Sequence, residues 1–259
     1  KRSSGKSRWL PLSTHLAETP IEREFVARGT GLQKAFLERL GAWHPSLLDE
    51  YAKGLHPVQH LEPILQAATD AGRPFLVAHV NDATDQAIEI LARTRTRVAY
   101  CPRSSAYFGA ERHFGPHRYR DMLDAGIHVC LGTDSVVNIT DGTLSIDPEG
   151  KSSGRLSVLD EMRFLWRRDR TDPATLMRMA TTSAVRALGT GSWLEDAHVC
   201  LDVTRPVPDT GHRRGDTPLA ILGVPCDRRK AGEAAVRSAL DSPDPPISIL
   251  TRILPVWQQ

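Results

Sequence analysis

The chain has 259 residues, of which 40% are hydrophobic, 25% charged and 6% aromatic. This composition is that of an ordinary soluble globular protein, and it excludes a disordered or collagen-like chain. The 33 basic and 31 acidic residues leave a formal net charge of only +2. The charge therefore gives no reason to expect a nucleic-acid or acidic-membrane partner. The length suits one (β/α)₈ barrel of about 250 residues or two smaller domains.

The cysteines and the apolar segments bear on the cellular compartment. The four cysteines lie far apart and form no C-x-x-C pair, so we expect reduced thiols in a cytoplasmic protein. The basic residues at 1–9 precede no apolar segment of the signal-peptide type. No apolar run approaches the ~20 residues of a membrane helix, so we expect no membrane partner.

The first part of the chain shows a mixed pattern of elements. In chain order we expect a strand at Trp9–His15, a helical stretch broken by glycines at Ile21–Leu40, a loop with a helical turn at Trp43–Leu55, and a helix at Leu61–Ala71.

From Pro74 onward, apolar strands alternate with helices. The expected strands are Pro74–Val80, Arg97–Cys101 and Ile127–Leu131, and the helices between them are Ala83–Leu91 and Tyr119–Ala125. Such alternation indicates an α/β protein with a parallel sheet. Two further helices are expected at Val158–Arg167 and Pro173–Leu188.

Beyond Gly191 the composition changes. Arg205–Asp216 is rich in Pro, Gly and Arg, and only Pro218–Val224 reads as a strand. We expect residues 1–190 to form one domain. Residues 191–259 form a tail with too few apolar segments to build a core alone.

Polar residues follow the predicted strands. His15 and Glu18 follow the first, His79 the second, Arg103 and Ser104 the third, and Asp134 the last. In parallel barrels the active site lies at this edge, where the βα loops converge. Two imidazoles and a carboxylate suit Zn²⁺ or Fe²⁺ with a coordination position left for water.

Five motifs at these positions occur in one order. They are His15-x-x-Glu18, the strand-end His79, Cys101-Pro102-x-Ser104, the G-T-D-S of 132–135, and the helix M-A-T-T-S-A-V-R-A-L-G of 179–189. Together they make the sequence resemble the amidohydrolase superfamily, in its cytosine deaminase-like branch. That branch includes methylthioadenosine and S-adenosylhomocysteine deaminases, guanine deaminases and triazine chlorohydrolases.

The resemblance implies a fold and a set of residue roles. The fold is the C-terminal half of a metal-dependent TIM (β/α)₈ barrel, strands five to eight, with a tail from a small β-sandwich. The implied metal residues are His15, Asp134 and His79. His15 and Asp134 ligate one divalent ion, and His79 orients the attacking water. Glu18 shuttles a proton, and Asp134 accepts the proton of the water. The implied reaction is deamination or dechlorination of a small nitrogen heterocycle or amidine.

The sequence also departs from the family pattern. The family has an H-x-H pair after its first strand, and no H-x-H occurs in these 259 residues. Ser105 replaces the asparagine of C-P-x-S-N. We therefore expect the chain to be either the C-terminal portion of a larger enzyme or a truncated relative. As partners we expect a second copy of the chain, in a homo-oligomer, or an N-terminal half supplied elsewhere. The alternative function is an inactive domain that binds or scaffolds.

Other features have plainer explanations. Glu18 could serve only as a carboxylate at a helix start. His56 and His60 have the i, i+4 spacing of a helical metal pair but lack the glutamate of H-E-x-x-H. The arginines of 93–97 and 167–170 are expected to lie on solvated helix faces rather than to bind nucleic acid.

Overall fold

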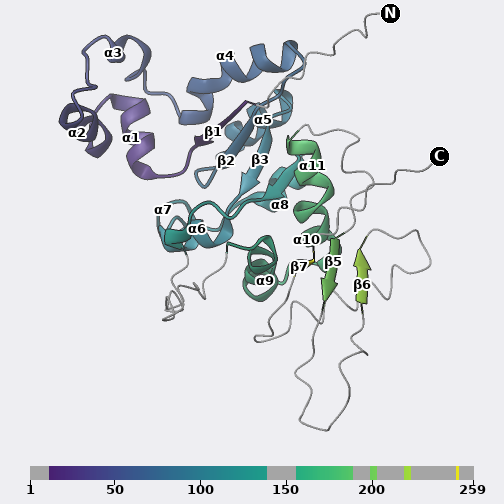
Figure 1. Cartoon of the computed structure of the whole chain (residues 1–259). Coiled ribbons are helices and arrows are strands. Elements are labelled where there is room, and N and C mark those ends of the chain that lie inside the picture. Colours follow the sequence, from purple (N-terminus) through teal and green to yellow (C-terminus); the bar gives the residue numbers. More distant parts are fainter. Residues whose placement is uncertain (1–11, 139–155, 189–198, 203–218, 223–248, 251–259) are drawn as a thin grey trace, which may run out of the picture.

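Four short parallel strands form the centre of the structure, a computed structural model that describes residues 12–138, 156–188, 199–202, 219–222 and 249–250 (Figure 1). They are β1 (Ser13–Leu16), β2 (Leu76–His79), β3 (Arg97–Tyr100) and β4 (Val129–Leu131). Their spatial order is their chain order, and each neighbouring pair is parallel. Successive strands of a (β/α)₈ barrel lie in this order, whereas a doubly wound sheet reverses it at a switch point. The α/β prediction is confirmed. Residues 9–11 of the first predicted strand lie outside the described residues.

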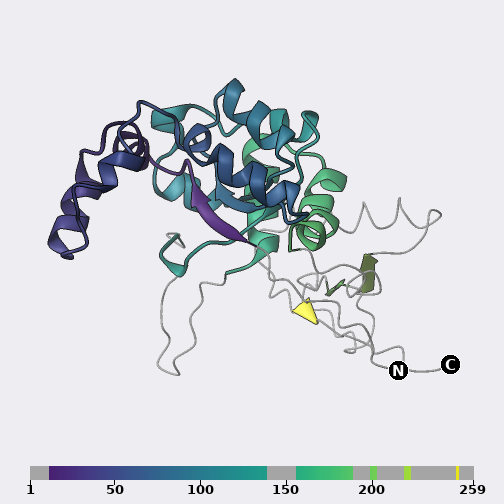
Figure 2. The same ribbon diagram turned by 90° about the horizontal axis from the view of Figure 1, so that it is seen from above.

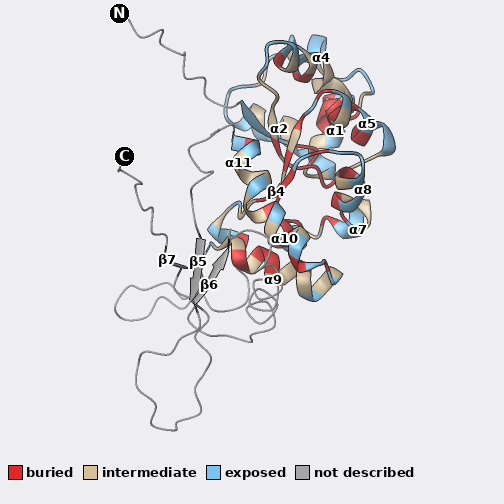
Figure 3. Ribbon diagram, turned by 90° about the vertical axis from the view of Figure 1, so that its right-hand side faces the viewer, coloured by how far each residue is buried: buried red, intermediate tan, exposed pale blue. Residues whose placement is uncertain are grey.

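The main core lies between one face of this sheet and its helices. Val77, Val98 and Val129 are register partners across β2, β3 and β4, and all three are fully buried. Side chains alternate between the two faces of a strand, so these valines share one face. They belong to a core that also contains Leu65 and Leu91 from two of the covering helices. In Figure 3 the buried residues gather along the strands and the inner sides of the helices.

The helices that complete this core begin at residues whose side chains cap them. In α4 (Pro57–Asp70) the His56 side chain forms a capping box with Gln59, so the helix starts one turn earlier than the apolar spacing predicts. In α5 (Asp85–Arg93) the Thr84 hydroxyl accepts a hydrogen bond from the Ala87 amide.

Three helices between β1 and β2 stand to one side of the sheet (Figure 2). They are α1 (Pro20–Arg28), α2 (Leu32–Arg39) and α3 (Leu47–Glu50). Gly29 ends α1 with φ +66°, and a Cβ atom there would lie 2.2 Å from Leu48 Cδ2. The positive φ favours glycine here, whereas the exposed tip of Leu48 could move aside. The predicted break in this helical stretch is confirmed.

The remaining helices follow β3 and β4. They are α6 (Pro102–Tyr107), α7 (Glu111–Phe114), α8 (Tyr119–Asp124), η1 (Val136–Asn138), α9 (Val158–Asp169), α10 (Pro173–Ala180) and α11 (Thr182–Leu188). The single helix predicted at 173–188 is wrong. Thr181 leaves the helical region with φ −123° and ψ −86°, and its hydroxyl donates to the Met177 carbonyl at 2.6 Å. A threonine that bonds back to the preceding turn competes with the helix backbone in this way.

The surroundings of Arg168 also differ from the prediction. Instead of lying on a solvated face, its side chain is largely buried, donates to the Tyr100 hydroxyl and pairs with Glu111 and Asp169.

A second, antiparallel sheet has the order β6-β5-β7 and consists of β5 (Val199–Asp202), β6 (Leu219–Leu222) and β7 (Ile249–Leu250). The predicted strand at 218–224 corresponds to β6, and the segment 205–216 lies outside the described residues. The β-sandwich and the domain division at 190 stay predictions. Within the described ranges, no helix combines the length and apolar character needed to cross a membrane.

Candidate active site

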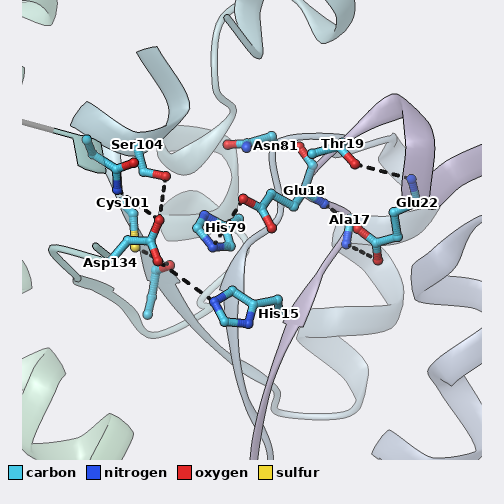
Figure 4. A network of polar contacts seen from close by, with 12 residues as sticks. His15, Ala17, Glu18, Thr19, Glu22, His79, Asn81, Cys101, Ser104 and Asp134 are labelled. Atoms are coloured by element: carbon cyan, nitrogen blue, oxygen red, sulfur yellow. Dashed lines mark hydrogen bonds and ion pairs between the residues drawn. The ribbon is translucent and has the colours of Figure 1, made fainter. Parts of the chain in front are cut away.

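Three side chains predicted as metal residues meet at the carboxyl ends of the strands (Figure 4). His15 lies on β1, His79 ends β2, and Asp134 follows β4. The two imidazole rings stack with centroids 5.0 Å apart, and His15 Nε2 lies 3.9 Å from Asp134 Oδ1. One ligand atom from each residue lies within 4.8 Å of the others. Strands far apart in sequence therefore bring together two imidazoles and a carboxylate.

Glu18 joins this cluster from the loop after β1. Its carboxylate Oε1 lies 3.7 Å from His79 Nε2. The main chain turns at Ala17, which has φ +52°, before α1 begins at Pro20. The turn is held by Glu22, whose carboxylate accepts hydrogen bonds from the amides of Ala17 and Glu18 at 2.8 and 2.7 Å. The carboxylate that holds the turn before α1 is thus that of Glu22, whereas the carboxylate of Glu18 faces the cluster.

A second contact fixes the main chain at Glu18. The Asn81 side chain donates to the Glu18 carbonyl at 3.1 Å, and the Asp82 amide donates to the Ala17 carbonyl at 2.9 Å. The loops after β1 and β2 are therefore tied together beside the cluster. Asp82 is itself buried and lies 3.3 Å from His56 Nε2 and 3.1 Å from Arg23.

His79 reaches the cluster through an unusual backbone conformation. Both His79 and Val80 have positive φ, at 73° and 53°. This left-handed region costs a non-glycine residue roughly 1–2 kcal/mol, and a β-branched residue there is a genuine outlier. By strand alternation His79 would share the core-facing side of Val77, so the turn redirects its ring.

The surroundings set the charge states of Glu18 and His79. Burial lowers the pKa of His79 to about 4, with His15 acting in the same direction and Asp134 against it. The imidazole is therefore neutral at pH 7, and its Nε2 is buried without a hydrogen-bond partner among the described residues. Burial also raises the pKa of Glu18, assisted by the negative charges of Asp134 and Glu22 and opposed by His15. A carboxyl group of raised pKa is suited to take up and release a proton.

Asp134 has the opposite environment. Its Oδ2 accepts hydrogen bonds from Ser104 Oγ at 2.7 Å and from Asn138 Nδ2 at 2.9 Å. Burial opposes ionisation, but these two bonds and the nearby His79 and His15 lower the pKa of Asp134. Asp134 therefore stays ionised, and its Oδ1 faces His15.

These residues fit a divalent cation. Neutral imidazole and carboxylate are ligands of Zn²⁺ and Fe²⁺, and three protein ligands leave a position for water. The unpartnered, buried His79 Nε2 and the Oδ1 of Asp134 are the atoms such an ion would use.

Other sequence candidates lie elsewhere or act indirectly. Arg103 points to α9, where its main-chain amide and Nε bind the fully buried carboxylate of Glu161. His56 caps α4, and the His60 ring stacks on Tyr51 with centroids 4.8 Å apart, so the spacing of these histidines reflects helix capping and packing. Asn138, which donates to Asp134, was not predicted from the sequence. Its position four residues after Asp134 could have indicated a contact between the two side chains.

Comparison with known proteins identifies the family. The model of the amidohydrolase family matches residues 6–193. An aminodeoxyfutalosine deaminase of Deinococcus radiodurans is 31% identical over 186 residues, covering 70% of this chain and 39% of that protein. A 5-methylthioadenosine/S-adenosylhomocysteine deaminase of Halalkalibacterium halodurans is 28% identical over 190 residues, covering 69% and 33%. A probable guanine deaminase of Schizosaccharomyces pombe is 26% identical over 125 residues, covering 48% and 18%.

The chain thus spans well under half of the length of each of these relatives. The family match covers the whole four-stranded sheet, its helices and all four residues of the cluster. With the match to its family model and the strand-end cluster in agreement, the chain belongs to the amidohydrolase family.

Proposed function

We propose that this chain carries out metal-dependent hydrolytic deamination of a nitrogen heterocycle or amidine-like small molecule. The observation that supports it best is the meeting of His15, His79 and Asp134 with a Glu18 carboxylate of raised pKa. Deamination is preferred to dechlorination because the three relatives named above are deaminases.

His15, His79 and Asp134 would hold one divalent ion, Zn²⁺ or Fe²⁺, which when bound supplies Lewis acidity and lowers the pKa of a water ligand to ~7. Asp134, which stays ionised, accepts a proton from the attacking water. His79 would orient this water through the ion that its Nε2 helps to hold, and its neutral ring adds no charge to the site.

Glu18 moves the second proton. Its raised pKa lets the carboxyl group protonate the departing amino group and recover a proton afterwards. Water adds its oxygen to the ring carbon, the C–N bond breaks, and the amino group leaves as ammonia.

Finer assignments belong to the same proposal. Cytoplasmic location is supported by Cys101 and Cys130, which are buried free thiols. A domain boundary near residue 190 is supported by the change from the parallel α/β part to the antiparallel sheet. The inactive binding domain is not favoured, because the four residues of the cluster are present and brought together.

The test is an ammonia-release assay with the purified chain, loaded separately with Zn²⁺ or Fe²⁺. The substrates are S-adenosylhomocysteine, 5-methylthioadenosine, aminodeoxyfutalosine and guanine. We expect ammonia and the hydroxylated heterocycle in equal amounts from at least one substrate, and loss of both in D134A. A folded, metal-loaded chain that releases no ammonia from any of them would overturn the proposal.

A further inference from the structure

The left-handed turn at His79 and Val80 needs contacts that hold it, because neither residue favours this conformation by itself. The amide of Val80 donates to the Leu16 carbonyl of β1 at 3.0 Å. This bond fixes the nitrogen side of the peptide between His79 and Val80. The carbonyl side of the same peptide must be held by another group.

That group is the imidazole of His117. Its Nε2 lies 2.9 Å from the His79 carbonyl oxygen. A carbonyl oxygen can only accept, so Nε2 carries the hydrogen and the bond runs from His117 to His79. His117 is buried, with 8% of its surface exposed, and precedes α8 in a segment otherwise remote from the site.

The His117 ring is itself held in place. It stacks on Tyr100 of β3 with centroids 3.6 Å apart and the planes 14° from parallel. The Tyr100 hydroxyl accepts a hydrogen bond from Arg168 Nη2 at 2.9 Å. A chain of contacts therefore runs from α9 through Tyr100 and His117 to the main chain of His79.

We propose that His117 is a positioning residue, whose hydrogen bond to the His79 carbonyl holds the left-handed turn that aims the His79 ring at His15, Glu18 and Asp134. His117 is not a catalytic residue, because its ring contacts the main chain behind His79. The catalytic consequence rests on the proposed function, whereas the conformational consequence stands without it.

The test compares three variants of the full chain. His117→Phe keeps a ring that can stack on Tyr100 but removes the donor. His117→Gln restores an N–H donor at similar reach. His113→Phe is the matched control, since His113 is an exposed histidine on the neighbouring α7.

The first measurement is the crystal structure of each variant. In H117F we expect φ of His79 or Val80 to leave the positive region and the distance between the His15 and His79 rings to increase. H117Q and H113F should keep the wild-type turn. If H117F fails to fold, the same comparison is made with His117→Asn, whose shorter amide cannot reach the carbonyl. A donor-free variant that keeps both positive φ angles and the His79 ring position would overturn the proposal.

The second measurement is deaminase kinetics. Because a displacement of about 1 Å costs ~10²-fold in rate, kcat of H117F should fall by about 10–100-fold with little change in KM. H117Q should recover most of this loss, and H113F should show none. Equal losses in H117F and H117Q would contradict the proposal. If wild type releases no ammonia, the proposed function fails, while the crystal structures still decide the role of His117.

Discussion

Ser104 provides a sharp test of how the site holds its carboxylate. Its hydroxyl donates to Asp134 Oδ2 at 2.7 Å, which leaves Oδ1 directed at His15. We expect Ser104→Ala to weaken zinc binding, because Asp134 would lose one of the two donors that favour its ionised form and fix its orientation.

The structure sets the expected size of the effect. A hydrogen bond to a charged acceptor contributes about 1.5–3 kcal/mol, and loss of a group that holds a metal ligand costs ~10–100-fold in metal affinity. Asp134 is partly exposed and keeps its bond from Asn138, so the lower end applies. We expect the Kd for Zn²⁺ to rise about tenfold, or ~1.4 kcal/mol.

The measurement is competition for Zn²⁺ against a chromophoric chelator at pH 7. The matched control is Ser105→Ala, because Ser105 is the next residue of α6 and is equally buried, but its hydroxyl has no hydrogen-bond partner among the described residues. Ser105→Ala should leave the Kd unchanged. An unchanged Kd in S104A, or the same weakening in both variants, would refute the assignment of Ser104 as the residue that orients Asp134.

Two further predictions concern the proton carrier and the stability of α10. Glu18→Gln should lower kcat by about 10²–10⁴-fold with little change in melting temperature, as measured by ammonia release and thermal unfolding. Asp172 caps α10 by accepting hydrogen bonds from the next turn, so Asp172→Ala should lower the free energy of unfolding by about 1 kcal/mol, as measured by urea denaturation. Ser157→Ala should change it little, because the Ser157 side chain makes no capping bond to α9. Hydrogen bonding lowers the pKa of Asp172, so its stabilisation is full above the unfolded pKa of about 3.9 and is lost as the pH falls through the folded pKa. A cost of D172A that stays constant down to pH 2 would contradict this account.

Much of the fold follows from patterns within short stretches of sequence. Apolar runs such as Val77 and its neighbours place the strands, and apolar spacing places the helix predicted from Ala83 to within two residues of its start after the Thr84 cap. His15 and Asp134 were predictable as a pair because the ends of parallel strands converge on one edge.

The motifs single out Glu18 and Ser104, but a local pattern does not show what separates each of them from its chemically identical neighbour. Glu22 holds the turn before α1 by accepting hydrogen bonds from the amides of Ala17 and Glu18, whereas the Glu18 carboxylate faces the cluster. Ser104 and Ser105 are likewise adjacent, and the orientation of α6 decides that the Ser104 hydroxyl, rather than that of Ser105, donates to Asp134. These distinctions depend on contacts between separate loops, which a local pattern does not contain.

His79 shows the same limit most clearly. Its place at the end of an apolar strand predicts a residue of the active-site edge, yet its alternation with Val77 predicts a side chain in the core. The conflict is resolved by two left-handed residues, and the donor that holds their carbonyl comes from 38 residues further along the chain. The direction of this ring is therefore a tertiary property. For His79, a place in the active site requires loops that hold the turn bringing its ring across, and replacement of His117 tests that requirement.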